Sequence, residues 1–269
     1  MPEGHVVHRQ ARQLTRTFKG HRVRVASPQG RFAAGAKVLS GKTFTKAEAR
    51  GKHLFIGFDN LRWIHIHLGL YGKWQFGKGA RPDDTGLIRL RITSATDFAQ
   101  LRGPAVCELL TADEMAVALA RIGPDPIHKQ ADPDRAFERV HRSAAAIGAL
   151  LMNQKIFAGV GNIYRAEVLF RHRQSPFTPG RLIAREQFDA IWSDLVLLMN
   201  LGVKDGRIDT VRAAHLPEVM GREPRVDRHG GEVYVYRREG MKCFVCGAKV
   251  KMADMQGRKL YWCANCQVA

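Results

Sequence analysis

The sequence lacks long hydrophobic runs and is poor in acidic residues. No uninterrupted apolar stretch approaches the roughly 20 residues of a membrane span, and the first residues do not have the charged-then-apolar order of a secretory signal. Only 25 Asp and Glu stand against 43 Lys and Arg, a formal net charge of +18. We therefore expect a cytosolic, nucleoid-associated protein with a polyanionic partner, for which nucleic acid leads. An anionic membrane surface and a merely solvated basic surface are the alternatives.

Cysteine is scarce except near the end of the chain. Of five cysteines, four form the two pairs Cys243-Phe-Val-Cys246 and Cys263-Ala-Asn-Cys266, and Cys107 stands alone. Two C-x2-C pairs joined by a short hairpin favour a closed tetrahedral thiolate site over a disulfide framework. We expect one structural Zn²⁺; an iron–sulfur site or two redox pairs are the alternatives. Cys107 is expected to be a small buried hydrophobe.

The first part of the chain has the alternating pattern of β-strands. Four segments show it: 22–25, 53–58, 63–67 and 87–92. A helix is expected before them, from Gly4 to Phe18. These patterns predict an antiparallel β-sandwich over residues 1–121. Gly123-Pro-Asp-Pro126 and the polar residues after it predict a linker at 122–133, and no internal repeat is apparent.

The second part of the chain has a helical pattern, with helices expected at 144–154, 162–172 and 185–201. The first two are joined by the loop 155–161. Gly159 and Gly161 let the main chain of this loop approach a ligand closely, and Asn162 is a favourable N-cap for the next helix. A phosphate would fit at that helix N-terminus. The alternative is an ordinary helical hairpin whose glycines only serve the turn. The whole chain is thus predicted to be α+β.

The second residue carries a chemical possibility of its own. Removal of Met1 would make Pro2 the terminal amine, with the Glu3 carboxylate beside it. A terminal amine is far less protonated at neutral pH than a lysine and is therefore a better nucleophile. Attack on an aldehyde carbon would give an iminium ion, which is an electron sink. A chance sequence in a disordered terminus is the alternative.

Several motifs together resemble the formamidopyrimidine-DNA glycosylase and endonuclease VIII family of base-excision repair enzymes. The resemblance runs nearly end to end. Its motifs are Pro2-Glu3-Gly4, Arg50-Gly-Lys-His-Leu-Phe55, His67-Leu-Gly-Leu-Tyr-Gly72, Gly123-Pro-Asp-Pro126, Leu151-Met-Asn-Gln-Lys-Ile-Phe-Ala-Gly-Val-Gly-Asn-Ile-Tyr164, and Gly257-Arg258 with Cys263-Ala-Asn-Cys-Gln267. The resemblance implies a β-sandwich catalytic domain (1–121), a helix-two-turn-helix DNA-binding domain (134–230) and a zinc β-hairpin finger (231–269).

The resemblance also implies roles for single residues. Pro2 would displace the damaged base and form a Schiff base with the sugar, and Glu3 would be the acid/base that helps to open the deoxyribose. Lys52, Asn162 and Arg258 would hold the phosphates of one kinked strand. Such contacts give affinity without reading sequence. Each residue taken alone also has a purely structural interpretation. Lys52 would be a solvated lysine, Asn162 an ordinary helix N-cap and Arg258 a surface arginine.

A base that is taken out of the duplex leaves a gap that the enzyme must fill. Leu70 and Tyr71, in a glycine-flanked turn, suit that role, and core packing is the alternative. Lys155 and His67 lie in matching motifs and are assigned to DNA binding as well. Leu70-Tyr71-Gly72 and the Tyr261-Trp262 pair make the chain similar to the endonuclease VIII branch, which acts on oxidised pyrimidines.

The chain departs from the family at His5 and Val6, where a proline and a second glutamate usually stand. The leading hypothesis is a monomeric bifunctional DNA glycosylase and abasic-site lyase that acts on damaged double-stranded DNA by β/δ-elimination and needs no redox cofactor. The sequence leaves open whether bubble or single-stranded DNA is used, and whether oxidised guanine is preferred. A non-catalytic, zinc-containing DNA-damage-binding relative is the second hypothesis. An RNA-binding zinc protein is disfavoured because it gives Pro2-Glu3 no role.

Overall fold

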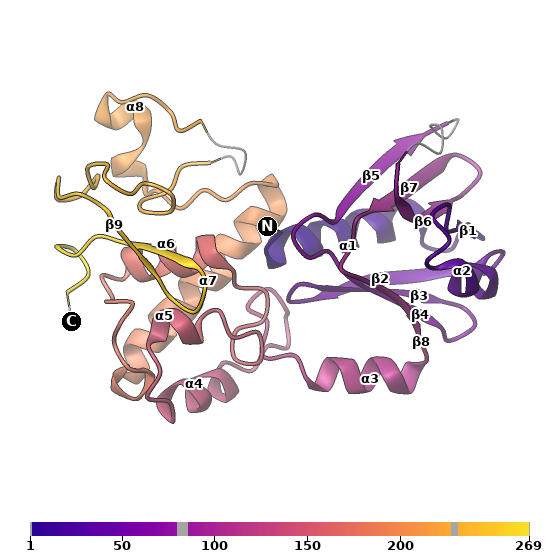
Figure 1. The fold of residues 1–269 in the computed structure, drawn as a ribbon, viewed down its shortest axis with the longest axis horizontal. Helices are drawn as coiled ribbons and strands as arrows, with labels where there is room; N and C mark the ends of the chain where they lie inside the picture. The colour runs from indigo at the N-terminus through magenta and orange to yellow at the C-terminus, as the bar shows by residue number, and fades with distance from the viewer. Residues whose placement is uncertain (1, 80–85, 227–230, 269) are drawn as a thin grey trace. The chain divides into compact units, whose positions relative to one another are not determined.

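The computed structural model describes residues 2–79, 86–226 and 231–268. The chain forms two compact units, Met1–Arg121 and Ile122–Ala269 (Figure 1). Each unit has a hydrophobic core of its own, and the two cores share no residue. The units are therefore described one after the other.

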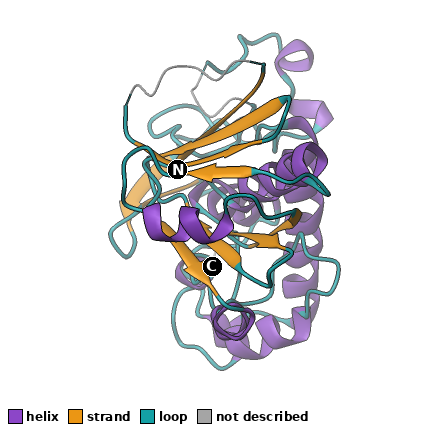
Figure 2. Cartoon of the chain, turned by 90° about the vertical axis from the view of Figure 1, so that its right-hand side faces the viewer, coloured by secondary structure: helices purple, strands orange, loops and turns teal. Residues whose placement is uncertain are grey.

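The first unit is a sandwich of two four-stranded sheets with the strand orders β1-β6-β7-β5 and β2-β3-β4-β8. All the pairs are antiparallel, and the strands are drawn in orange in Figure 2. The strands are β1 (Arg24–Ala26), β2 (Phe44–Arg50), β3 (His53–Phe58), β4 (Trp63–His67), β5 (Lys73–Lys78), β6 (Ile88–Thr93), β7 (Asp97–Arg102) and β8 (Val106–Leu110). The antiparallel sandwich expected from the alternating pattern is thus confirmed.

The core of this unit lies between the sheets and takes residues from both. Leu90 and Leu101 come from one sheet and Leu54 and Ile66 from the other, and all four side chains are buried. Helix α1 (Gly4–Phe18) closes this core with an apolar face of Val7, Ala11, Leu14 and Phe18. The bounds of α1 agree with the helix expected from the sequence.

Two shorter helices complete the first unit, α2 (Ala33–Leu39) and α3 (Ala112–Ala120). Helix α3 begins with a capping box. The Thr111 hydroxyl accepts a hydrogen bond from the amide of Glu114, and the Glu114 carboxylate accepts one from the amide of Thr111. Two amides that have no partner within the helix are satisfied in this way.

The second unit is helical apart from a two-stranded hairpin. Its elements are α4 (Pro133–His141), α5 (Ile147–Leu150), α6 (Asn162–Arg171), η1 (Gly180–Leu182), α7 (Arg185–Asp205), η2 (Ala213–His215), α8 (Pro217–Met220), β9 (Lys251–Asp254) and β10 (Lys259–Trp262). Its core joins helix residues such as Phe170 and Leu195 to Tyr261 of β10 and to Val250, which directly precedes β9. The hairpin therefore packs as part of this unit.

The helix expected at 144–154 is wrong in length, because α5 has only four residues. Polar side chains hold the chain after it in turns. The Gln154 amide donates to the carbonyls of Met152 and Val160 and accepts from the amide of Gly159. Asn153 accepts from the amide of Lys155. Such side-chain bonds compete with those of a helix. Helix α7, by contrast, runs four residues beyond the expected end and stops at Gly206, which has φ +77°.

Among the described residues, every helix is too short or too polar to cross a membrane.

Candidate active site and nucleic-acid interface

Helix α1 lies antiparallel to strand β2, and this sets where the helix begins. The amide of Gly20 donates to the carbonyl of Phe44 over 2.9 Å, and the Thr15 hydroxyl bonds both the carbonyl and the amide of Ala47. From Thr15 back to Glu3 the helix rises about 18 Å, and from Ala47 on to Lys52 the strand extends about 17 Å. The start of α1 and the Lys52 turn therefore lie at the same end of the first unit.

A second turn leaves the sheet at this end. Lys52 is the second residue of the two-residue turn between β2 and β3, in which Gly51 has φ +58°. His53 pairs with His67 across β3 and β4, so the loop 68–72 leaves the sheet beside the Lys52 turn. Gly69 in that loop has φ +65°, and a Cβ there would come within 2.8 Å of the Ala105 Cβ. Only glycine suits that position.

The residues around the start of α1 are packed against the first unit. Glu3 is the N-cap residue of α1 and is buried, while Pro2 is half-buried. His5 is also buried, and burial, with His8 and Arg9 nearby, lowers its pKa to about 4. A carboxylate thus follows Pro2 directly, and a neutral imidazole stands where the family usually has proline.

Leu70 and Tyr71 project into solvent. Their exposed fractions are 59% and 80%, so neither side chain packs in the core, and the core-packing alternative for them is wrong. The turn that carries them is held by a hydrogen bond from the amide of Gly72 to the carbonyl of Leu68. The loop therefore presents two large apolar side chains beside the Lys52 turn. Such exposed side chains are typical of binding surfaces.

In the second unit, Asn162 joins helix α6 to the hairpin. Its side-chain amide donates to the carbonyl of Lys259 over 2.9 Å. Arg165, one turn further along α6 and buried, donates to the Asn162 side-chain oxygen and to the same carbonyl. Arg165 was not predicted as a site residue, although its spacing of three residues from Asn162 is the signal that could have found it.

The expectation that Asn162 is a helix N-cap is wrong. Gly161 is the N-cap, and Asn162 is the first residue of α6. The Asn162 side chain is held instead by the carbonyl of Lys259 and by Arg165, 97 and 3 residues away in sequence. A tertiary contact has therefore replaced the local one.

Arg258 is exposed in the turn of the β9–β10 hairpin. The turn residues Gln256 and Gly257 both have positive φ, of 54° and 70°, which is the geometry of a type I′ turn. Met255 and Arg258 exchange backbone hydrogen bonds across it. Because Arg258 precedes Lys259, the structure brings Arg258 and Asn162 to neighbouring positions. Lys155 is exposed in the loop before α6, and its carbonyl accepts from Arg139.

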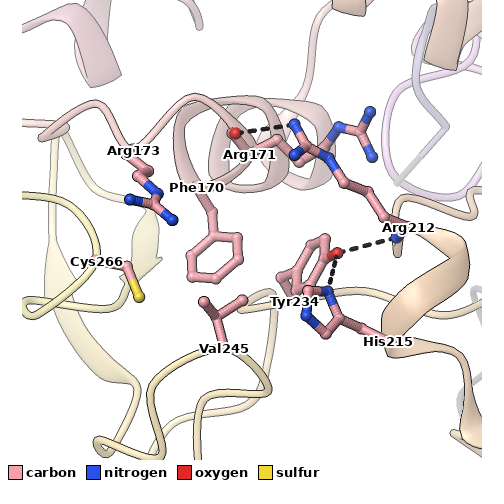
Figure 3. A pocket seen from close by; sticks show the side chains of 8 residues that line it. All are labelled: Phe170, Arg171, Arg173, Arg212, His215, Tyr234, Val245 and Cys266. Atoms are coloured by element: carbon pink, nitrogen blue, oxygen red, sulfur yellow. Dashed lines mark hydrogen bonds between the residues drawn. The ribbon is translucent and has the colours of Figure 1, made fainter. Parts of the chain in front are cut away.

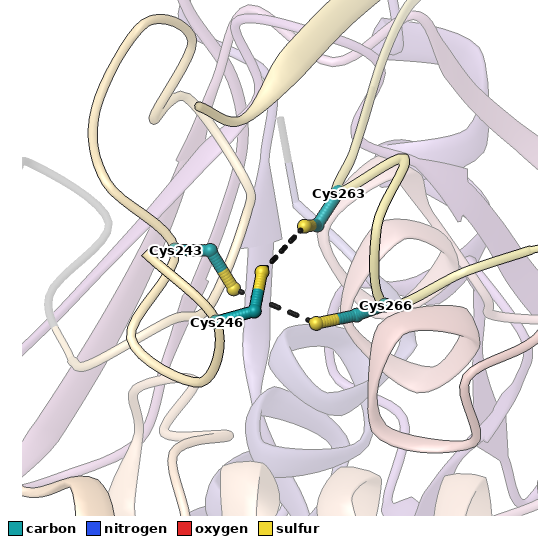
Figure 4. Close-up of side chains that lie close together, drawn as sticks. All are labelled: Cys243, Cys246, Cys263 and Cys266. Carbon is teal, nitrogen blue, oxygen red and sulfur yellow. Dashed lines mark hydrogen bonds between the residues drawn. The ribbon is translucent and has the colours of Figure 1, made fainter. Parts of the chain in front are cut away.

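The four clustered cysteines meet at one point, as Figure 4 shows. The sulfur atoms of Cys243, Cys246, Cys263 and Cys266 all lie within 4.8 Å of one another, and Cys107 is elsewhere, in strand β8. Burial and the neighbouring thiols raise the pKa of Cys266. The four sulfur atoms are thus placed to hold a metal ion, and the donor set fits tetrahedral Zn²⁺.

A small pocket in the second unit lies against the cysteine cluster (Figure 3). Its lining residues are Phe170, Arg171, Arg173, Arg212, His215, Tyr234, Val245 and Cys266. The charge of Arg171 is matched by Asp194, with nitrogen–oxygen distances of 2.6 and 2.8 Å. The Tyr234 hydroxyl accepts from the amide of Arg212 and bonds His215. The first contact ties α6 to α7, and the others join parts of the segment that precedes the hairpin to one another.

The chain matches two family models that together cover most of its length. The formamidopyrimidine-DNA glycosylase N-terminal domain matches residues 1–104, and the formamidopyrimidine-DNA glycosylase H2TH domain matches residues 122–213. Endonuclease 8 1 of Mycobacterium tuberculosis is 46% identical over 276 residues, which cover 99% of this chain and all of the relative. Endonuclease 8 of Salmonella typhi is 27% identical over 99% of this chain and all of the relative.

Solved structures agree with the fold. The Lactococcus lactis Fpg in complex with an abasic site containing DNA superposes with a TM-score of 0.79 at 22% identity, over 98% of this chain and 99% of that chain. MutM in complex with carbocyclic 8-oxo-G containing DNA gives 0.80 at 21% identity, over 99% of each chain. The chain belongs to the formamidopyrimidine-DNA glycosylase and endonuclease 8 family of DNA glycosylases and abasic-site lyases, which act in base-excision repair.

Proposed function

We propose that this chain removes oxidised bases, chiefly pyrimidines, from double-stranded DNA and cleaves the resulting abasic site through a Schiff base on Pro2. The observation that carries the proposal is the meeting of Pro2-Glu3 and the Lys52 turn at one end of the first unit. An amine, a carboxylate and a phosphate-binding cation are the groups that this chemistry needs.

The reaction begins with attack of the Pro2 amine on the sugar C1′ carbon, once Met1 has been removed. The bond between the Pro2 nitrogen and C1′ forms as the bond from C1′ to the base breaks. The Glu3 carboxylate takes up the proton that the Pro2 nitrogen loses and passes it to the ring oxygen, so that the deoxyribose opens to the iminium. The positive end of helix α1 disfavours the ammonium form of the amine and so favours attack. The iminium then acidifies the C2′ hydrogen, and its loss expels the 3′ phosphate.

The same electron sink drives the second elimination, which releases the 5′ phosphate. Hydrolysis of the final Schiff base frees the Pro2 amine. No electrons are exchanged with a redox partner, so the chain needs no redox cofactor for either elimination. Whether one or both phosphates leave sets the ends of the nicked strand, which gel electrophoresis distinguishes.

Damaged DNA is the proposed partner, and several features support it. The formal charge of +18 suits a polyanion, and the exposed Leu70 and Tyr71 can fill the space of an extruded base. In the second unit, Asn162, the neighbouring Arg258 and Lys155 are proposed to bind backbone phosphates. His67, on β4 of the first unit, is a further proposed DNA contact. The 46% identity to proteins named Endonuclease 8 1 supports oxidised pyrimidines as the preferred lesions.

Zinc is proposed for the four-cysteine cluster, in a structural role. Cys243, Cys246, Cys263 and Cys266 would hold the ion and so fix the hairpin that carries Arg258. The ion would close the second unit's hairpin, and no reaction step uses it.

Borohydride trapping tests the mechanism. Demethionylated protein is mixed with abasic and thymine-glycol duplexes and reduced, and we expect a covalent protein–DNA adduct. Pro2→Gly should form at least about tenfold less adduct than the parent chain. Lys37→Gln, which removes one exposed positive charge on α2, is the control and should form as much as the parent chain.

The same assay separates the proposal from its main rival. If the processed protein binds the damaged duplex but gives neither adduct nor nicked strand, the chain is a non-catalytic damage-binding relative. A lesion panel that includes 8-oxoguanine and thymine glycol decides the base preference. Faster nicking at 8-oxoguanine would overturn the pyrimidine assignment.

A further inference from the structure

Three histidines and a glutamate form a connected group on one face of the β2-β3-β4-β8 sheet. His53 lies on β3, His65 and His67 on β4, and Glu108 on β8. The Nδ1 atom of His53 is 2.8 Å from Nε2 of His65, and Nδ1 of His65 is 2.7 Å from a Glu108 carboxylate oxygen. These two hydrogen bonds make one chain across three strands.

The carboxylate fixes which nitrogen carries each proton. An ionised carboxylate only accepts, so Nδ1 of His65 must donate to Glu108. Nε2 of neutral His65 is then an acceptor, and Nδ1 of His53 must be the donor to it. The remaining nitrogen, Nε2 of His53, is left with its lone pair. The tautomers of His53 and His65 thus both follow from the charged Glu108 carboxylate.

The two ends of this hydrogen-bonded series, Glu108 and His53, lie in different surroundings. His65 in the middle is buried, and its ring stacks on Phe55 with 4.9 Å between the centroids. The Glu108 side chain is 52% exposed. His53 is half-buried, directly follows Lys52 and lies 5.0 Å from the ring of His67. The hydrogen-bonded series therefore runs from the solvent-exposed Glu108, across the face of the sheet, to His53 at the Lys52 end of the first unit.

We propose that Glu108, His65 and His53 form a proton relay that carries a proton from the Lys52 end of the sheet to solvent during the lyase steps. The inference rests on the proposed function for the source of that proton, which is the C2′ hydrogen lost in elimination. His53 is the accepting end, and His65 and Glu108 are the residues that position it and pass the proton on.

The transfer balances without an added reagent. Nε2 of His53 gains the proton, the Nδ1 proton of His53 passes to Nε2 of His65, and the Nδ1 proton of His65 passes to Glu108. Both rings end neutral in the opposite tautomer. The half-exposed Glu108 then releases its proton to water. Before the next transfer, each ring must lose its Nε2 proton and regain one on Nδ1, by exchange of its ring protons with water.

The surroundings of His53 agree with such a path. Burial first, and then His65, His67 and Lys52, lower the pKa of His53 to about 4. Burial, Lys52 and His65 also lower the pKa of His67. Lys46, Glu48 and Arg50 of β2 are further charged groups on this face, opposite Gly57, Phe55 and His53 of β3. Lys46 and Glu48 form an ion pair with each other. An imidazolium is thus unfavourable at His53, and a relay that moves the proton onward avoids forming one.

The alternative is that these rings only pack the sheet face. Glu108→Gln separates the two roles, because its amide oxygen still accepts from His65 but its amide group cannot take up a proton. We expect Glu108→Gln to keep the wild-type tautomers of His53 and His65 in nitrogen NMR spectra. Its single-turnover elimination rate should fall at least about tenfold, while the Kd for DNA changes by less than about twofold.

Two further variants complete the test. Glu108→Ala should be as slow as Glu108→Gln and should recover rate when formate is added, because a small carboxylate can reach the half-exposed site. Glu48→Gln removes a charge from the neighbouring strand, where Glu48 pairs with Lys46, and should leave rate and tautomers unchanged.

Either of two results overturns the relay. One is an elimination rate of Glu108→Gln within about twofold of wild type. The other is a His65 ring that carries its proton on Nε2 in the resting protein. Absence of any adduct from the wild type would instead refute the proposed function. The tautomers of His53 and His65, measured by NMR, would still test the hydrogen bonds between Glu108, His65 and His53.

Discussion

Buried imidazoles give individual residues of the first unit a marked pH dependence. Burial lowers the pKa of both His5 and His53 from 6.5 to about 4. Between these values the unfolded chain binds protons that the folded chain does not. The stabilising effect of each neutral ring is therefore complete above pH 6.5 and is lost as the pH falls towards 4.

We expect the free energy of unfolding of the first unit to fall by about 1–3 kcal/mol per histidine across this range. Urea unfolding followed by amide hydrogen exchange at pH 7, 6 and 5 measures it. His5→Gln should flatten the profile, whereas His141→Gln, at an exposed position on α4, should not. A profile of His5→Gln as steep as that of the parent chain would contradict the assignment of His5.

Single elements depend on local contacts that can be removed one at a time. The capping box of α3 is one of them. Thr111→Ala removes the hydroxyl that accepts from the Glu114 amide and should destabilise the first unit by about 1 kcal/mol. Thr111→Ser keeps the hydroxyl and should cost much less. Equal midpoints of urea unfolding for the two variants would show that the cap contributes nothing.

The hairpin and helix α6 should act as a unit in DNA binding, because Asn162 bonds the carbonyl of the residue after Arg258. Asn162→Ala and Arg258→Ala should each weaken binding by about 1 kcal/mol. The double variant should lose clearly less than the sum of the two. Fluorescence anisotropy on an abasic duplex measures this cycle, and additive losses would refute the coupling.

Hydrophobic periodicity predicted the helices and strands whose bounds depend mainly on their own residues. Helix α1 and strands β3 and β4 have the expected bounds. The buried residues of α1 recur at helical spacing, and β3 and β4 are short, mostly buried segments. The length of α5 was not predictable in this way. The residues expected to extend this helix form turns instead, which hydrogen bonds of the Gln154 and Asn153 side chains hold. The histidine chain was also missed. It depends on the register of β8 against β4, and β8 carries little alternation.

For the whole molecule, the candidate site residues divide between the two units. Pro2, Glu3 and Lys52 belong to the first, and Asn162, Arg258 and the four cysteines belong to the second. The motifs of the sequence suggested these residues, and the structure adds contacts that hold them, such as that of Asn162 with the carbonyl of Lys259, 97 residues away in sequence. Long-range contacts of this kind leave no local pattern in the sequence.

Loss of the metal site should therefore affect one unit and spare the other. Cys243→Ser removes one sulfur atom of the proposed metal site, within the second unit's core, and should lower DNA affinity at least about tenfold, with faster amide exchange in the hairpin. Amides of the first unit should exchange as before. Cys107→Ser, in strand β8, is the matched control and should keep full affinity. Full DNA affinity of Cys243→Ser would contradict a structural metal.

The central claim is that the Pro2 amine forms the covalent intermediate. Peptide mass spectrometry of the borohydride-trapped adduct tests it most directly, because it shows which nitrogen carries the deoxyribose. The account predicts that the sugar is attached to Pro2 of a chain without Met1. Attachment to a lysine, or full nicking activity in a chain that retains Met1, would contradict it.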